Sequence, residues 1–372
     1  MAGLSLAQEI KTVYPESELT FFATSKRFEE QCITEKGFLF KKLKYTVGRK
    51  RSIFQKIRFL TGLAIDTIYS CVVIRRLKPD LIVGLGGYSS VPTVVAAVIM
   101  FVPFVLIDQN VIPGKVNRFF SKWAKEVYCH FPEAIKQFKN AKSVVATGNP
   151  LRKEIFSVKK DESARSLGLS LKKKTLLILG GSQGATAINE TMINCLSEFE
   201  KYSDGLQIIH CTGEMDFEEV RKVYDQYAVD AYICTFMSNI ETAYSLADVV
   251  VSRAGAGTIT EITALGLPAI LVPYPFAADN HQYFNALEAA KQGAAYLISQ
   301  ENFTVNTAVA LITEILMDDN KREKMKARSK SIGKPDAAKA ILERIKSLVI
   351  TTQVYDTNRS GSRFSGSTVG KT

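Results

Sequence analysis

Three glycine-rich turns, each lying between a short apolar segment and a segment of helical pattern, most strongly constrain the fold of this chain. They span residues 84–90, 180–185 and 252–257. A strand that runs through a glycine turn into a helix is typical of a parallel sheet, because parallel neighbours need a crossover connection. The sequence therefore predicts an α/β fold with two Rossmann-like domains facing one cleft.

The composition along the chain predicts where these domains begin and end. The chain has 372 residues, which is enough for two α/β domains. We expect a first domain over 1–156 and a second over 157–334, followed by a terminal helix over 335–350. Residues 351–372 are rich in Ser, Gly, Thr and Asn and poor in apolar groups, so we expect a disordered tail.

The net charge of +11 indicates a polyanionic partner, such as anionic lipid, phosphorylated substrates or nucleic acid. Nucleic acid is not expected, because no recognised nucleic-acid-binding motif is present. The three His show no metal-ligand spacing. The six Cys are scattered and form no CxxC pair, and this cysteine pattern favours a reducing, cytoplasmic setting. The longest apolar candidate, 94–107, contains Pro103 and favours a buried helix and strand over a membrane span.

The third glycine turn predicts a site for a nucleotide sugar. A strand over 248–252 enters the turn, and a helix opens near Thr258 with free backbone N–H groups suited to an anion. Glu261 adds an acceptor for paired sugar hydroxyls. Gln282 and Asn285 add neutral donors and acceptors.

The other two glycine turns are candidate phosphate sites with a simpler alternative. In the turn after residue 180, small residues let a phosphate approach the backbone and Ser182 adds a hydroxyl. It is not a P-loop, because no Gly-Lys-Ser/Thr follows. The loop over 84–90 could hold a second phosphate group. The alternative for both is a tight strand-to-helix turn.

Polar residues that follow the predicted strand over 104–107 are candidates for chemistry, since ligands bind at the carboxyl ends of parallel strands. Asp108 is the best carboxylate in the first half for a general base. The alternative is helix capping by Asp108 or Asn110. Arg152 could pair with a diphosphate, or it could be a solvated residue at the domain boundary.

A basic segment with apolar residues at helical spacing lies between 41 and 58. Such a segment can lie on an anionic membrane surface, or it can be the solvated face of an ordinary core helix, and the sequence favours neither. The basic residues are Lys41, Lys42, Lys44, Arg49, Lys50, Arg51, Lys56 and Arg58, beside Phe54, Ile57, Phe59 and Leu60.

Taken together, these motifs resemble the bacterial family of UDP-N-acetylglucosamine–N-acetylmuramyl-(pentapeptide) pyrophosphoryl-undecaprenol N-acetylglucosamine transferases, the MurG family. The resemblance covers about residues 3–350. It rests on Gly86-Gly87-Tyr88, Gln109-Asn110 with Pro113-Gly114 and Asn117-Arg118, Thr147-Gly148-Asn149-Pro150 with Arg152, Gly180-Gly181-Ser182-Gln183-Gly184-Ala185, and Ser252-Arg253-Ala254-Gly255 with Glu261 and Gln282.

The resemblance implies a GT-B glycosyltransferase that moves GlcNAc from UDP-GlcNAc to the 4-hydroxyl of the muramyl sugar on lipid I, giving lipid II with inversion. It implies no cofactor and no obligatory metal. It places the enzyme as a peripheral protein at the cytoplasmic face of the cell membrane, with UDP-GlcNAc, lipid I, the anionic membrane surface and cell-wall synthesis proteins as partners.

The resemblance also implies a role for each matching residue. The donor-binding set would be Asn110, Arg152, Ser182, Met237, Ala256, Gly257, Thr258, Glu261, Gln282 and Asn285, with the backbone at Met237 flanking the uracil and Glu261 holding the ribose hydroxyls. The acceptor diphosphate would face Gly86, Gly87, Tyr88 and Ser89.

Two departures from the family pattern affect these expectations. The family opens with a strand and a Gly-Gly-Thr-Gly-Gly-His loop, whereas this sequence opens with residues that match the helix after that loop. The family's His-Glu before Gln-Asn is here Ile107-Asp108. We expect the true start to lie upstream. The alternatives are a UDP-GlcNAc-binding protein inactive through loss of the first glycine loop, or another GT-B lipid glycosyltransferase, such as one acting on diacylglycerol.

Overall fold

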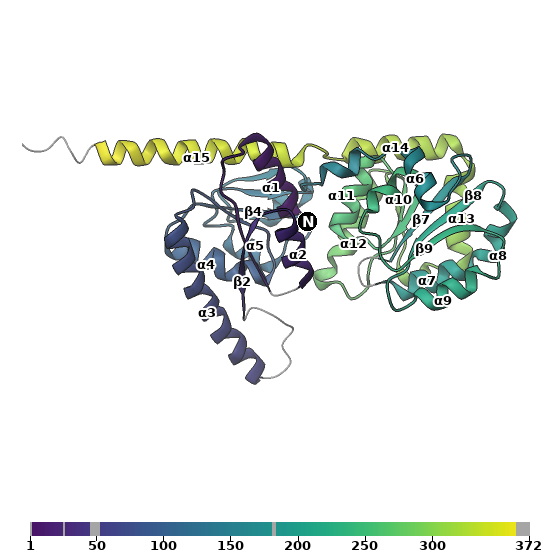
Figure 1. The fold of residues 1–372 in the computed structure, drawn as a ribbon, viewed down its shortest axis with the longest axis horizontal. Coiled ribbons are helices and arrows are strands. Elements are labelled where there is room, and N and C mark those ends of the chain that lie inside the picture. Colours follow the sequence, from purple (N-terminus) through teal and green to yellow (C-terminus); the bar gives the residue numbers. More distant parts are fainter. Residues whose placement is uncertain (1, 25–26, 45–52, 181–183, 362–372) are drawn as a thin grey trace, which may run out of the picture. The chain divides into compact units, whose positions relative to one another are not determined.

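The computed structural model describes residues 2–24, 27–44, 53–180 and 184–361, and the chain divides into two compact units (Figure 1). Unit 1 consists of 1–108, 114–150 and 336–372, and unit 2 of 109–113 and 151–335. The boundary between the two units therefore follows Pro150, whereas the sequence analysis expected the first domain to end at residue 156. The C-terminal helix belongs to unit 1, and the short loop 109–113 belongs to unit 2.

Unit 2 contains one six-stranded parallel sheet. Its strands are β7 (Lys174–Leu179), β8 (Leu206–Cys211), β9 (Asp230–Cys234), β10 (Val249–Ser252), β11 (Ala269–Leu271) and β12 (Ala295–Leu297). They lie in the order β12-β11-β10-β7-β8-β9. The chain leaves the centre of the sheet in one direction and later returns to fill the other half, which is a Rossmann-like topology whose strand order reverses between β7 and β10.

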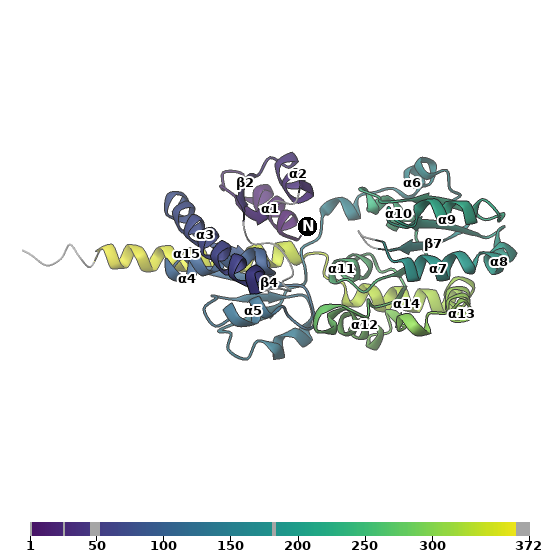
Figure 2. The ribbon, with the colours of Figure 1, turned by 90° about the horizontal axis from the view of Figure 1, so that it is seen from below.

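Helices cover both faces of this sheet, because its strands are apolar on both sides (Figure 2). In Figure 2, α6 (Lys160–Leu167) and α10 (Ile240–Leu246) lie on one side, and α7 (Thr186–Asn194), α13 (Val305–Met317) and α14 (Asp319–Ile332) lie on the other. The remaining helices of unit 2 are α8 (Leu196–Phe199), α9 (Phe217–Tyr224), α11 (Ala256–Leu265) and α12 (His281–Lys291). Fully buried side chains such as Ile178, Ile188 and Ile312 form the core between β7, α7 and α13.

Unit 1 contains two separate parallel sheets. One pairs β1 (Thr20–Thr24) with β2 (Leu39–Leu43). The other has the order β3-β4-β5-β6, formed by β3 (Ile82–Gly84), β4 (Phe104–Asp108), β5 (Val127–Cys129) and β6 (Val144–Ala146). Within the described residues, β1 pairs only with β2, and β3 pairs only with β4, so each strand ends its sheet.

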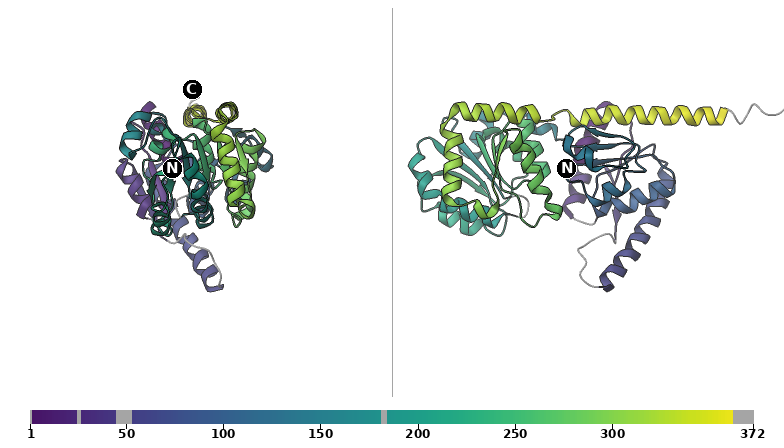
Figure 3. Two further views of the ribbon diagram at one scale, coloured as in Figure 1. Left: turned by 90° about the vertical axis from the view of Figure 1, so that its right-hand side faces the viewer. Right: turned by 180° about the vertical axis from the view of Figure 1, so that it is seen from behind.

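Helices from both ends of the described chain pack on the four-stranded sheet of unit 1. Leu6 of α1 (Ala2–Val13) and Ile341 and Ile345 of α15 (Ala337–Gly361) form one core cluster with Ile107 and Tyr128 of the strands. Helices α1 and α15 contact each other. In Figure 3, α15 continues as a helix beyond this contact, and it ends at Gly361, whereas the sequence analysis expected a tail from residue 351.

The long helix α3 (Ile53–Leu77) of unit 1 is apolar on its exposed side. It packs on α4 (Val91–Ile99), and Asp66 accepts a hydrogen bond from the Lys44 backbone N–H. The stretch 57–77 is nevertheless long and apolar enough to cross a membrane by length and composition, with only 33% of its most apolar window buried. The sequence analysis took 94–107 as the longest apolar candidate, and this prediction was wrong, because 57–77 is longer. A helix of this kind fits either a core position or a membrane surface.

Unit 1 also contains α2 (Arg27–Glu35) and α5 (Lys115–Phe120), and short 3₁₀ turns lie between the main elements in the described part of the chain. Apart from the C-terminal helix, which runs on to Gly361, the strands and helices that the sequence singled out occur within a few residues of their expected bounds. The strands β2, β5, β6 and β12 were not expected, and three of them have only three residues.

Candidate functional site

The turn between β10 and α11 has the geometry of an anion site. Gly255 is the N-cap of α11 in an extended conformation, with φ −64° and ψ 139°, and no side chain caps the helix in this described segment. A Cβ added at Gly257 would meet no heavy atom within 4 Å. Packing therefore does not require glycine there. The open space in front of the helix start leaves room for a ligand at its N–H groups.

Glu261 lies one turn further along α11 and is held by neighbouring side chains. The Tyr244 hydroxyl of α10 donates to Glu261 Oε2 at 3.0 Å. Burial raises the pKa of Glu261, while Tyr244 and the nearby Arg152 act in the opposite direction. Arg152 itself lies 3.5 Å from the carboxylate of Glu241. The carboxylate of Glu261 is thus held in a fixed orientation. Tyr244 and Arg152 offset only part of the cost of burying its charge, so the carboxylate is suited to accept further hydrogen bonds from ligand hydroxyls.

Asn285 of α12 binds the loop 109–113, which follows β4 in the chain and belongs to unit 2. Its side-chain Oδ1 accepts from the Val111 N–H at 2.9 Å, and its Nδ2 donates to Asn110 Oδ1 at 3.0 Å. Asn285 is fully buried. The structure therefore brings Asn110 and Asn285 together as the sequence analysis grouped them. The amide of Asn285 is occupied by this loop.

Gln282 and Arg253 organise the loop after β11. Gln282 Oε1 accepts from the Tyr274 N–H at 2.9 Å. Arg253 donates to the carbonyls of Val272 and Pro273, both at 3.3 Å, and its guanidinium lies 5.5 Å from the centre of the Tyr274 ring. The sequence analysis quoted Arg253 only as part of a motif and gave it no role. The basic residue directly after a buried strand was the signal that could have identified it.

The turn after β7 is tightly packed at both ends. A Cβ at Gly180 would lie 2.9 Å from Ala185 N, and one at Gly184, where φ is +79°, would lie 2.9 Å from Thr212 O. These two glycines are therefore required by the turn itself. Ser182 lies outside the described residues, so its predicted contact with phosphate stays a prediction.

Residues around this turn form a buried polar network. Asn189 Oδ1 lies 3.0 Å from Nε2 of His210, and Asn189 Nδ2 donates to Thr212 O at 2.8 Å. Burial lowers the pKa of His210 to about 3. This network holds the ends of β7 and β8 in place, and His210 stays neutral within it. Met237, expected to flank the uracil, is buried in the segment after β9.

In unit 1, Asp108 ends β4 and holds the start of α5. Its Oδ2 accepts from the Gly114 N–H at 3.1 Å and from Asn117 Nδ2 at 2.9 Å. Asp108 is only 4% exposed. Asp108 therefore fastens the loop before α5 and does not cap this helix, whose N-cap is Gly114 without a side-chain cap hydrogen bond. A role as general base stays a prediction.

The glycine loop after β3 has a backbone that only glycine adopts easily. Gly86 and Gly87 have φ of +79° and +73°. A Cβ at Gly86 would lie 2.8 Å from Asn117 Nδ2, so the loop also packs closely on α5. Tyr88 is exposed and lies edge-on to Phe59 of α3, and Ser89 is partly exposed. The loop thus presents Tyr88 and Ser89 beside the helix with the exposed apolar face.

Comparison with known proteins identifies the family. Residues 2–129 match the glycosyltransferase family 28 N-terminal domain, and residues 175–341 match the family 28 C-terminal domain. The UDP-N-acetylglucosamine–N-acetylmuramyl-(pentapeptide) pyrophosphoryl-undecaprenol N-acetylglucosamine transferase of Thermodesulfovibrio yellowstonii is 36% identical over 349 residues, which are 93% of this chain and 94% of the relative. The Bacillus licheniformis protein of the same name is 36% identical over 353 residues, with the same coverage of both chains. The crystal structure of Acinetobacter baumannii MurG matches with a TM-score of 0.71 and 26% identity, covering 93% of this chain and 95% of that chain.

The chain belongs to the MurG family. This membership confirms the predicted fold class, with two Rossmann-like domains of the GT-B type. That the two domains face one cleft stays a prediction.

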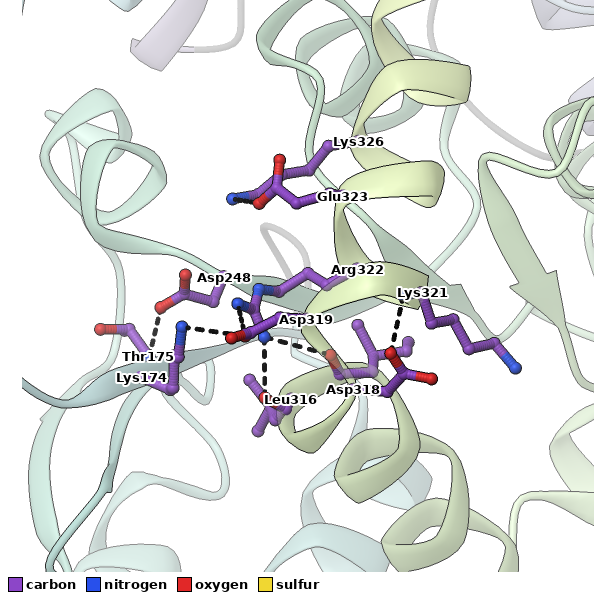
Figure 4. A network of polar contacts seen from close by, with 11 residues as sticks. Lys174, Thr175, Asp248, Leu316, Asp318, Asp319, Lys321, Arg322, Glu323 and Lys326 are labelled. Atoms are coloured by element: carbon purple, nitrogen blue, oxygen red, sulfur yellow. Dashed lines mark hydrogen bonds and ion pairs between the residues drawn. The ribbon is translucent and has the colours of Figure 1, made fainter.

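The MurG-family chain also has an open hollow of about 510 Å³ at the other end of the unit 2 sheet. It is lined by Asp248, which precedes β10, by Gly266, which follows α11, and by Lys326 and Lys330 of α14. Figure 4 shows the polar contacts beside it: the Thr175 N–H donates to Asp248, and buried Arg322 donates to the Leu316 carbonyl. This end holds the amino ends of β7 and β10, so the hollow lies away from the glycine turns.

No cluster of three or more His, Cys, Asp or Glu side chains that could hold a metal ion occurs within the residues that the structure describes.

Proposed function

We propose that this chain transfers GlcNAc from UDP-GlcNAc to the muramyl 4-hydroxyl of undecaprenyl-pyrophosphoryl-MurNAc-pentapeptide, inverting the anomeric centre and producing lipid II. One observation carries the proposal: 36% identity over 93% of the chain to relatives named for this transfer. The geometry of unit 2 supports it, because the start of α11 offers an anion site with a carboxylate one turn away.

In the proposed donor site, the diphosphate of UDP binds the first turn of α11 at Ala256, Gly257 and Thr258. The N–H groups and the dipole of this helix stabilise the negative charge that develops on UDP as it leaves. Glu261 accepts hydrogen bonds from the two ribose hydroxyls. The backbone at Met237 flanks the uracil, and Arg152 and Ser182 contact the donor phosphates.

The sugar would be read by Gln282 and Asn110, with Asn285 in a supporting role. Both polar atoms of Asn285 already bind the loop 109–113. We therefore assign Asn285 to holding Asn110 in position. Gln282 is partly exposed and can reach GlcNAc hydroxyls with its amide group.

Asp108 is our candidate for the base that takes the proton of the acceptor hydroxyl. A base must lie within hydrogen-bond reach of that proton. Asp108→Asn separates this role from loop holding: loss of kcat with an unchanged circular dichroism spectrum and unchanged UDP affinity supports the base. A fall in thermal stability without a specific loss of kcat assigns Asp108 to the loop alone.

The acceptor lipid would meet unit 1 at Gly86, Gly87, Tyr88 and Ser89, beside a membrane-docking face on α3. That face carries the exposed apolar side chains Phe54, Ile57, Leu60, Ile65, Ile68 and Val72. Large exposed apolar patches mark interaction sites. The charge of +11 adds attraction to anionic lipid. The site of action would be the cytoplasmic face of the cell membrane, where cell-wall synthesis proteins would also meet the enzyme.

Vesicle sedimentation tests the docking face. Ile57→Ser with Ile68→Ser should reduce the fraction bound to phosphatidylglycerol vesicles. The matched control is Phe276→Ser, which removes a side chain of unit 2 that is 76% exposed. Equal loss in both variants would contradict docking through α3.

Product analysis tests the acceptor. With UDP-GlcNAc and a lipid I analogue, we expect a β-linked disaccharide on the lipid, and with diacylglycerol we expect no product. Glycosylated diacylglycerol as the main product would overturn the proposal in favour of another GT-B lipid glycosyltransferase.

The split sheet of unit 1 favours a second candidate function. If the two sheets leave the acceptor side incomplete, the chain binds UDP-GlcNAc without transfer. Calorimetry distinguishes the two, since this candidate predicts UDP binding with no disaccharide.

A further inference from the structure

Two cysteines lie side by side at the carboxyl ends of neighbouring strands in unit 2. Cys211 is the last residue of β8 and Cys234 is the last residue of β9, and the two are register partners. Their Sγ atoms are 3.5 Å apart. Both are free thiols, as are the other four cysteines, none of which has a sulfur contact with another cysteine in the described part of the chain.

The spacing of the two strands suits a disulfide. Adjacent strands lie about 4.8 Å apart, and the Cα atoms of a disulfide usually lie about 4.4–6.8 Å apart. The two sulfurs need to approach from 3.5 Å to a bond length of about 2.05 Å. Rotation of the side chains supplies this movement without a change of strand register.

The two thiols differ in exposure and acidity. Cys211 is 8% exposed, whereas Cys234 is more exposed and belongs to β9, the edge strand of the sheet. The hydrogen bond from the Cys211 thiol lowers the pKa of Cys234, and the same bond together with burial raises the pKa of Cys211. Cys234 is therefore the thiolate that reacts first, and Cys211 is the partner that resolves it.

The backbone of both cysteines supports the segments next to the proposed donor site. The Gly180 N–H donates to Cys211 O at 3.1 Å, and the Thr212 N–H donates to Cys234 O at 2.9 Å. Met237 follows Cys234 by three positions. A covalent link between these strand ends therefore acts on the glycine turn and on the segment proposed to flank the uracil.

We propose that Cys211 and Cys234 are a modification site, a dithiol that hydrogen peroxide converts to a reversible disulfide, and that this bond weakens the binding of UDP. The Cys234 thiolate attacks one peroxide oxygen, the O–O bond breaks, and a sulfenic acid and hydroxide form. The Cys211 sulfur then attacks the Cys234 sulfur, the S–O bond breaks, and the second oxygen leaves as water. The two thiols lose two electrons and two protons, and the peroxide becomes two waters.

A dithiol reductant reverses the reaction through a mixed disulfide. The formation of the disulfide is independent of the proposed function, whereas its effect on UDP rests on it.

Peptide mapping of the full chain tests the bond. After treatment with hydrogen peroxide and then an alkylating reagent, we expect one cross-linked peptide pair holding Cys211 and Cys234, which dithiothreitol separates. Cys71, a partly exposed cysteine of α3, should stay alkylatable. Cys234→Ser should abolish the link, and Cys211→Ser should leave a sulfenic acid at position 234 that dimedone traps. Peroxide treatment that leaves both thiols alkylatable, or that gives only sulfinic acid at Cys234, overturns the proposal.

Titration with UDP before and after oxidation tests the consequence. We expect the affinity of the oxidised chain to fall several-fold and to recover with dithiothreitol, while Cys234→Ser is insensitive to peroxide. Equal affinity of the oxidised and reduced chains overturns the coupling to the donor site. Failure of the reduced chain to bind UDP instead contradicts the proposed function, and the cross-linked peptide still decides the modification.

Discussion

The two units of this chain use the same strand, glycine turn and helix design but complete their sheets differently. Unit 2 joins six parallel strands in one sheet, and apart from the loop 109–113 it comes from one run of chain, 151–335. Unit 1 has a two-stranded and a four-stranded sheet and draws on residues before 150 and after 336. The proposed donor half thus comes almost entirely from one continuous run of chain, whereas the proposed acceptor half also needs the C-terminal helix.

The difference predicts where the molecule is least stable. In unit 1, β1 and β3 each end a sheet, and a strand edge leaves backbone groups without ladder partners. The helices α1 and α15 provide the apolar cover of the four-stranded sheet. Changes in these helices should affect unit 1 alone, and changes at α11 should affect binding without affecting the fold.

The largest effect is expected from Ile341→Ala in α15. Ile341 is fully buried against Ile107 and Tyr128, so the cavity should lower the stability of unit 1 by about 2–5 kcal/mol. Hydrogen exchange measured by mass spectrometry should show faster exchange in β4 and β5 and unchanged exchange in β7 and β8. The control is Ile350→Ala, which removes a 50% exposed side chain from the same helix. If hydrogen exchange becomes equally faster in both units, the inference that α15 stabilises unit 1 alone is contradicted.

Glu261→Ala should weaken UDP binding by about 1–3 kcal/mol, because the ribose hydroxyls lose a charged acceptor. Two effects on folding oppose each other, because the buried Tyr244 hydroxyl loses its acceptor while a buried charge is removed. Burial raises the pKa of Glu261, so the folded state favours the protonated form, and the ionised carboxylate is unfavourable for folding at neutral pH.

Glu261→Gln sharpens this prediction, since it keeps an acceptor for Tyr244 and removes the charge. Its melting temperature should equal or exceed that of the natural chain, while its UDP affinity falls. In the natural chain, UDP affinity should decline as the pH falls through the raised pKa. An unchanged affinity in both variants would count against the ribose assignment.

Gly257→Ala should show whether Gly257 is needed to leave room for the ligand or to allow the fold to pack. The new Cβ meets no atom within 4 Å, and Ala favours a helix by up to about 1 kcal/mol over Gly, so stability should stay the same or rise. UDP affinity, measured by calorimetry, should fall because the methyl group occupies the space of the diphosphate. Gly333→Ala is the contrasting variant: its Cβ would lie 2.4 Å from Thr263 O, so stability should fall. If Gly257→Ala binds UDP with the affinity of the natural chain, the diphosphate does not bind beside Gly257, and this part of the proposed donor site is wrong.

The smallest effect is expected from Arg344→Met. Arg344 bonds Glu126 in unit 1, but its side chain is 41% exposed, so solvent screening limits the loss to below about 1 kcal/mol. The bond to Arg344 lowers the pKa of Glu126, so this stabilisation is present above the ordinary carboxyl range and is lost as the pH falls through the lowered value. Acid titration of unfolding should therefore be shallower in the variant than in the natural chain.

The sequence predicted much of unit 2 because its signals are local. The apolar strands around 176–179 and 248–252 are each followed directly by a glycine turn, and the structure places both strands, and the turn after the second, as expected. The short strands β5, β6 and β12 were missed, since three residues give no usable periodicity.

Pairings across long sequence distances could not be predicted from the sequence. Nothing local shows that Asn285 holds the loop of Asn110, that Tyr244 orients Glu261, or that Asp108 is occupied by Gly114 and Asn117. These contacts depend on which elements pack together. They also show that the amide of Asn285, which was expected to bind the donor, is occupied by the loop of Asn110.

Transfer to a lipid I analogue on anionic vesicles tests the central claim most directly. UDP release and lipid-linked disaccharide are measured in one reaction with UDP-GlcNAc. The account predicts one β-linked disaccharide for each UDP released, with a rate that falls in Glu261→Gln. Binding of UDP without any disaccharide would contradict it.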